Sequence, residues 1–199
     1  MTREYTSTLT KAGFLFARLL KGYQISMSTY REFRGLSYID FPADYCLVDI
    51  ETTGLIPAND DIIEIGAVMC SGGEISGQFQ TLVKPQCRNG IFVDSFIQNL
   101  TGITNEMLSD APEAQTALAN FAEFLGGSVI VGYNVSFDVN FLYDGFMKYL
   151  KHPLTNNFID VLRISRRLCA DLPSRGIDSV MAHLGLEPDS RQFGRSMCC

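Results

Sequence analysis

The segment DIETTG, residues 49–54, places two acidic residues two positions apart at the end of an apolar run. Because side chains alternate across a β-strand, Asp49 and Glu51 are expected to point to the same face. Two carboxylates held together repel each other unless a cation neutralises them. The alternative is a polar strand end that faces solvent. The Thr-Thr-Gly turn favours a site, because its glycine lets the backbone come close to a ligand.

A third acidic residue lies in the segment NVSFD, residues 134–138. Asp138 is predicted to sit one turn into a helix that begins directly after a buried strand, residues 129–133. It would therefore project near the carboxyl end of that strand, where open α/β sheets usually place their sites. Taken alone, an acid in the first turn of a helix is explained by the helix dipole.

The elements that must position these acids follow from the apolar periodicity. Strands are predicted over residues 45–50, 61–70, 75–83, 129–133 and 158–159, and Gly72-Gly73 indicates a hairpin turn between the second and third. Helices are predicted over residues 94–125, with breaks at 101–102 and 111–112, and over 135–150, 161–169 and 179–184. Strands followed by helices around one mixed sheet imply a layered α/β domain. We assign it to residues 41–199, after a leader, residues 1–40, with an amphipathic helix over residues 9–20.

Composition limits the class of protein. The 199 residues are 46% hydrophobic and 19% charged, which is typical of a globular domain, and no segment is long and apolar enough to cross a membrane. The net charge is −6, with +4 in residues 1–37 and −10 in the rest. Binding of nucleic acid by bulk electrostatics is therefore unfavourable, and divalent cations would have to supply the positive charge. The scattered cysteines and the absence of a secretory signal predict reduced thiols and a cytoplasmic location.

Taken together, DIETTG and NVSFD resemble the motifs of the DEDD exonuclease superfamily, in its DEDDh branch. The linking segments IIEIGAV (62–68), LTGIT (100–104) and TNNFIDVLRISRR (155–167) strengthen the likeness, which extends over residues 45–186. The greatest similarity is to the proofreading epsilon subunit of bacterial DNA polymerase III. The resemblance implies a ribonuclease H-like fold, with a mixed five-stranded sheet flanked by helices, and a 3′–5′ exonuclease activity.

The resemblance also implies roles for single residues. Asp49, Glu51 and Asp138 would hold two Mg²⁺ or Mn²⁺ ions about 4 Å apart, as enzymes do that clamp both oxygens of a phosphoryl displacement. The residues implied in binding the terminal nucleotide are Thr52, Thr53, Gly54, Leu100, Thr101, Ile103 and Asn134. The implied partner is a single-stranded or frayed DNA 3′ end, with RNA left open, and a polymerase is a further candidate partner.

The family's third motif is a His, which acts as general base, followed five residues later by an Asp. Gly194 and Cys199 stand at these positions. His152 and His183 are expected elsewhere, in a turn and in the preceding helix. An incomplete C-terminus, an engineered replacement and natural degeneration all remain open as explanations. We expect impaired catalysis, and two alternatives stay open: a 3′-end-binding module with little catalysis, and an exoribonuclease.

Overall fold

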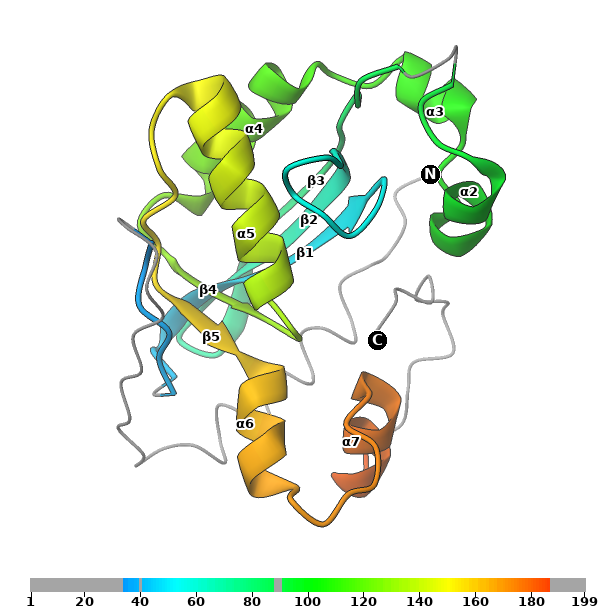
Figure 1. Cartoon of the computed structure of the whole chain (residues 1–199). Coiled ribbons are helices and arrows are strands. Elements are labelled where there is room, and N and C mark those ends of the chain that lie inside the picture. Colours follow the sequence, from blue (N-terminus) through cyan, green and yellow to red (C-terminus); the bar gives the residue numbers. More distant parts are fainter. Residues whose placement is uncertain (1–33, 40, 88–90, 187–199) are drawn as a thin grey trace.

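The computed structural model describes residues 34–39, 41–87 and 91–186, which form one mixed five-stranded sheet with helices on both faces (Figure 1). The strand order is β3-β2-β1-β4-β5. The strands are β1 (Asp44–Thr52), β2 (Ile62–Ser71), β3 (Glu74–Leu82), β4 (Val129–Gly132) and β5 (Phe158–Asp160). β1 pairs antiparallel with β2 and parallel with β4, so β1 is the central strand at which the two halves of the sheet meet.

The antiparallel half is a hairpin. β2 and β3 are joined at Gly72 and Gly73, whose φ angles of 59° and 94° are those that a tight two-residue turn requires. β3 is an edge strand whose side chains are mostly exposed or half-buried, whereas β1 is buried over most of its length. The polar alternation of β3 therefore fits its place at the edge.

The helices occupy the connections between strands. They are α2 (Ser95–Thr101), α3 (Asn105–Ser109), α4 (Ala114–Leu125), α5 (Ser136–Gly145), the π-helical turn η1 (Phe146–Leu150), α6 (Val161–Leu168) and α7 (Ile177–His183). Side chains that accept a hydrogen bond from the first turn, Asp94, Thr104 and Asp160, cap α2, α3 and α6. In the described residues, no helix has the length and apolar character needed to span a bilayer.

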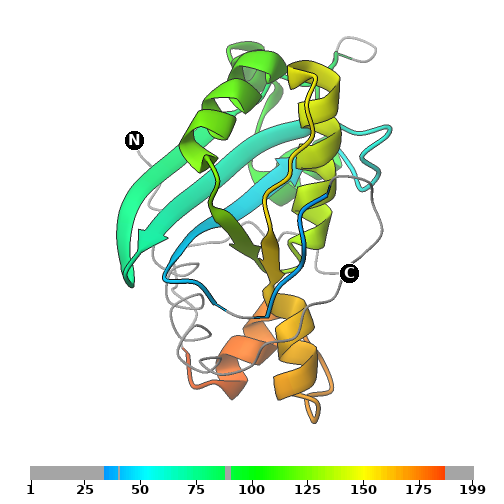
Figure 2. The ribbon, with the colours of Figure 1, turned by 90° about the vertical axis from the view of Figure 1, so that its left-hand side faces the viewer.

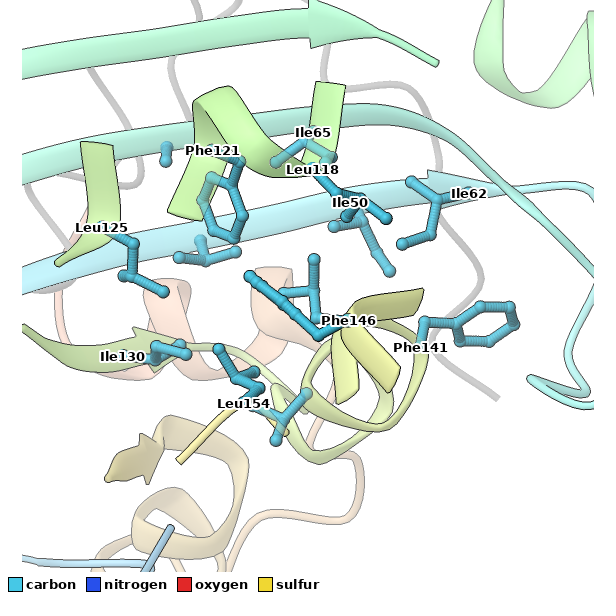
Figure 3. Close-up of a cluster of buried hydrophobic side chains, with 14 of the residues drawn as sticks. Ile50, Ile62, Ile65, Leu118, Phe121, Leu125, Ile130, Phe141, Phe146 and Leu154 are labelled. Atoms are coloured by element: carbon cyan, nitrogen blue, oxygen red, sulfur yellow. The ribbon is translucent and has the colours of Figure 1, made fainter. Parts of the chain in front are cut away.

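Alternate residues of β1 bury into opposite faces of the sheet. Cys46, Val48 and Ile50 pack in a cluster with Leu118 and Phe121 of α4. Figure 3 labels Ile50, Leu118 and Phe121 in this cluster, together with Phe141 and Phe146. The intervening Tyr45 and Leu47 join a second cluster on the other face, with residues of α6 and α7. Figure 2 shows the resulting layers, with α4 and α5 on one side of the sheet and α6 and α7 on the other. Both clusters hold the central strand, and with it the acidic segment at its end.

Most predicted elements are confirmed, including the hairpin and the two breaks that separate α2, α3 and α4. The helix predicted over residues 135–150 instead changes to π-helical geometry at Phe146. Residues 34–39 were assigned to the leader but belong to the domain, because Tyr38 and Leu36 exchange backbone hydrogen bonds with Phe158 of β5. The predicted leader helix lies outside the described residues.

Candidate active site

The site lies at the edge of the sheet where β4 ends and the parallel strand β1 continues beyond it to Thr52. β1 ends in Asp49, Glu51 and Thr52, and β4 leads through Tyr133 and Asn134 into α5. Asn134 has a φ angle of 59°, a left-handed conformation that asparagine tolerates better than most residues. Its backbone N–H donates to Asp160 Oδ1, and the hydroxyl of Ser136 donates to Asp160 Oδ2. Asp160 thus fixes the turn that aims α5 at the end of β1.

A direct hydrogen bond joins the two acidic segments. The Ile50 backbone N–H donates to Asp138 Oδ1 at 3.0 Å, across 88 residues of sequence. Asp138 is only 5% exposed, so its carboxylate lies almost out of contact with solvent. Because Ile50 lies between Asp49 and Glu51 in the sequence, the bond ties the Asp138 carboxylate to the middle of the acidic segment of β1.

These residues border a single cavity of about 250 Å³. β1 and the loop after it contribute one wall, α2 a second, and the turn between β4 and α5, with the first turn of α5, a third. The lining residues are Asp49, Ile50, Glu51, Thr52, Gly54, Leu55, Ile97, Leu100, Thr101, Tyr133, Asn134, Phe137 and Asp138. The cavity therefore combines a carboxylate floor with apolar walls.

The carboxylates disfavour one another's negative charge. Burial raises the pKa of Asp49 from 3.8 to about 6, and the charge of Glu64 adds to the shift. Burial likewise raises the pKa of Glu51 from 4.5 to about 8, with contributions from Asp49 and Glu64. The pKa of Asp138 is also raised, first by burial and then by the charge of Asp49, while the Ile50 N–H opposes the rise. A desolvated cluster of this kind would be stabilised by a bound cation.

Thr53 and Ile103, both predicted to bind the terminal nucleotide, do not line the cavity. The Thr53 hydroxyl accepts from the Asp61 N–H at 3.0 Å and so closes the loop between β1 and β2. Ile103 is 1% exposed and packs with Ile63 and Val93, because the chain turns inward at Gly102, where φ is 73°. The other predicted residues among those described all border the cavity.

The sequence analysis missed several lining residues, namely Ile50, Leu55, Ile97, Tyr133 and Phe137. All are apolar or aromatic, and their sequence patterns are those of ordinary core residues. Their closeness in the sequence to the predicted site residues was one signal that could have identified three of them. Tyr133 and Phe137 flank or lie within the NVSFD segment, and Ile97 lies one helical turn before Leu100 and Thr101.

His152 and His183 are both exposed and lie away from the cavity lining. Asp160, a nearby acid, has both oxygens occupied by the hydrogen bonds of the β4–α5 turn and by the Leu162 N–H that it caps. Gly194 and Cys199, the positions predicted for the general base and the fourth acid, lie outside the described residues.

The exonuclease family model RNase_T matches residues 47–193, which include every cavity-lining residue. The chain belongs to this exonuclease family. The exonuclease domain is 40% identical over 146 residues to the PolC-type DNA polymerase III of Caldanaerobacter subterraneus subsp. tengcongensis, and 37% identical over 145 residues to that of Staphylococcus aureus. Each alignment covers 73% of this chain but only 10% of the polymerase.

Solved structures give the same fold for the exonuclease domain. Escherichia coli Exonuclease I in complex with a dT13 oligonucleotide superposes with a TM-score of 0.62 at 21% identity, over 73% of this chain and 36% of that one. Its complex described as ExoI/SSB-Ct gives 0.64, over 74% and 37%. The predicted ribonuclease H-like exonuclease fold, with its mixed five-stranded sheet, is thus confirmed.

Proposed function

We propose that this domain removes nucleotides from the 3′ end of a DNA strand, with divalent cations held by Asp49, Glu51 and Asp138. The observation that carries the proposal is that these three carboxylates, from segments 88 residues apart, line one cavity. The family membership supports nuclease chemistry. The relatives named DNA polymerase III and the Exonuclease I complex with a dT13 oligonucleotide support DNA, in single-stranded form, as the substrate.

The donor set fits Mg²⁺ or Mn²⁺, because hard divalent cations prefer oxygen ligands and relieve the mutual repulsion of the carboxylates. When bound, such ions would supply an activated water and stabilise the departing oxygen. In the described part of the chain, however, no three acidic, cysteine or histidine side chains converge closely enough to form a ready-made metal centre. We infer that the half-buried Glu51 and Asp49 rotate inward when a cation binds, while Asp138 stays fixed by its bond to Ile50.

The chain's own side chains divide the substrate-binding task. The apolar wall of Ile97, Leu100 and Phe137 suits the faces of a nucleobase, and the carboxylate floor suits a metal-bridged phosphate. Phe137 is held against Phe141, with ring centroids 4.8 Å apart, so its ring is a fixed part of the wall. A cavity of about 250 Å³ is small, and it suits one terminal nucleotide rather than a length of duplex.

Catalysis by this chain is expected to be slow. Gly194 stands where the family's general base is expected, and loss of a general base lowers rates by about 10²–10⁴-fold. Cys199 would replace a carboxylate with a soft ligand that suits Mg²⁺ poorly. The same two residues favour a second function, in which the domain holds a 3′ end and cuts it little.

The test is digestion of a 5′-labelled single strand in Mn²⁺, which displays removal from the 3′ end as a descending ladder. The chain is compared with a G194H/C199D variant that carries a helical extension, and with D49A of that variant as the control. We expect a ladder from the repaired variant, a much weaker one from the chain itself, and none from D49A or after chelation of the metal.

Equal activity of the chain and its repaired variant would contradict the impairment. If no variant cuts but the chain binds the strand and Mn²⁺, the end-binding function is favoured. If neither binding nor cutting is seen, both functions are excluded.

A further inference from the structure

The helix α2 presents a large apolar side chain to solvent next to the cavity. Phe96 is 59% exposed, the highest value for any large apolar side chain in the described residues. A single exposed apolar residue needs no explanation in itself. Its relationship to the cavity wall is what makes Phe96 informative.

Phe96 and Leu100 are four residues apart on α2 and therefore lie on the same side of the helix, one turn apart. Leu100 lines the cavity together with Ile97 and Thr101. Phe96 thus extends the apolar wall by one helical turn, from the cavity towards open solvent. Phe96 itself does not line the cavity, so it stands one helical turn beyond the lining residue Leu100 on the same side of α2.

The ring is carried by a firmly anchored helix. Asp94 Oδ1 accepts from the Ile97 N–H at 2.9 Å, and the Thr101 hydroxyl donates to the Ile97 carbonyl at 2.9 Å. Ile97 and Thr101 are both buried. Because these contacts fix α2, an exposed ring on it would bind a partner with little further loss of backbone freedom.

We propose that Phe96 stacks on the nucleobase next to the terminal one, as a second base-binding position outside the cavity. This rests on the function proposed above, because it takes the terminal nucleotide to occupy the cavity. Three observations select a nucleobase as the occupant. The apolar face is continuous with the wall that faces the carboxylates, α2 carries no charged side chain, and an exposed aromatic ring stacks on any base regardless of sequence.

The absence of charge on α2 gives this contact a distinctive signature. Contacts to phosphate weaken steeply with salt, because they release counterions. A stacking contact made by Phe96 would not, so its contribution should be the same at low and high ionic strength.

The test is a double-mutant cycle on binding, with Ca²⁺ as the cation so that the strand stays intact. The full chain and its F96A variant are titrated with a short oligothymidylate, and with the same strand lacking the base at the second position from the 3′ end. For the full chain, we expect removal of that base to weaken binding at least about fivefold at every salt concentration. For F96A, binding of the complete strand should be weaker by a similar factor, and removal of the base should have no further effect.

Two further variants separate stacking from other roles. F96Y keeps an aromatic ring and should bind like the original chain, whereas F96L keeps an apolar side chain without a ring and should behave like F96A. The matched control is I75A. Ile75 is also exposed, but it pairs with Cys70 at the opposite end of the sheet from Glu51. Thermal melts verify that each variant is folded.

The outcomes distinguish this proposal from the function on which it rests. If the full chain binds the strand and F96A binds it equally well, the second base position is excluded while the proposed function stands. If F96L binds like the original chain, the contact is apolar docking and stacking is excluded. If the full chain binds no single strand, both proposals fail.

Discussion

The Asp138 carboxylate accepts a hydrogen bond from the Ile50 backbone N–H at 3.0 Å, although the two residues lie on different elements. Ile50 stands between Asp49 and Glu51, so the bond ties the third acid to the middle of the acidic pair. It also gives Asp138 a structural role in joining α5 to β1, in addition to its proposed role as a metal ligand. The two roles can be separated, because only one of them requires a negative charge.

Replacing Asp138 with Asn should remove the ligand while keeping the structural bond. The amide oxygen of Asn can still accept from the Ile50 N–H, and the loss of a desolvated charge favours folding. We expect D138N to be at least as stable as the original chain at pH 8 without metal, and to bind Mn²⁺ at least about tenfold more weakly. D138A leaves the buried N–H without a partner and should be less stable than D138N by about 1–3 kcal/mol. Urea denaturation and calorimetry measure these effects, and equal stability of the two variants would show that the bond to Ile50 contributes nothing.

The antiparallel pairing of β1 with β2 places Glu64 directly opposite Glu51. The Gln80 side-chain amide donates to Glu64 Oε1 at 2.9 Å, and the Glu64 charge raises the pKa of both Glu51 and Asp49. E64Q keeps an acceptor for Gln80 but removes the charge, so it should lower both pKa values. Mn²⁺ binding, followed by calorimetry over a pH series, should then begin at a lower pH than in the original chain. E74Q, at the far end of the sheet, is the control and should leave the profile unchanged.

The raised pKa values also predict how stability depends on pH without metal. Glu51 titrates near 4.5 when unfolded and near 8 when folded, and Asp49 near 3.8 and 6. Between these values the folded state binds more protons than the unfolded state, so stability falls as the pH rises. Thermal melts should therefore show a melting temperature that decreases from pH 5 to pH 8, and a smaller decrease in E51Q. Added Mn²⁺ should stabilise the chain more at pH 8 than at pH 5, because cations bind the deprotonated carboxylates. A melting temperature that rises over this range would contradict the assigned direction of the shifts.

Much of this arrangement could be predicted from the sequence, because the relevant signals are local. The run of apolar residues before Asp49 predicts a buried strand, and the spacing of Asp49 and Glu51 places both on one face. The apolar cavity wall could not be predicted in the same way. Phe137 borders the cavity, while Phe141 of similar pattern is buried in the protein. Periodicity identifies the inward face of an element, but only the packing of elements determines whether that face meets another side chain or a cavity.

Contacts between separate backbone segments could not be predicted from the sequence either. Nothing in the local sequence indicates that the Thr53 hydroxyl accepts a hydrogen bond within its own loop. Nor does it indicate that residues 34–39 lie along β5. Both depend on contacts between segments distant in the chain or on the course of a loop. Gly132, at the end of β4, is a third case, and it bears directly on the site.

Gly132 should tolerate no side chain. A methyl group there would meet the Val48 carbonyl oxygen and Val135 Cγ2, each at 2.8 Å. β4 would therefore have to move away from β1, just before the segment that carries Asn134 and Asp138. We expect G132A to destabilise the fold by about 1–3 kcal/mol, as overpacking of a dense interior does. It should also weaken Mn²⁺ binding, because α5 would shift with the strand. The control is G127A, in the turn before β4, where a methyl group would meet nothing within 4 Å and stability should change by less than about 0.5 kcal/mol. Urea denaturation of both variants decides the matter: equal stabilities would show that β4 can shift freely, and that the contact at Gly132 does not hold the site together.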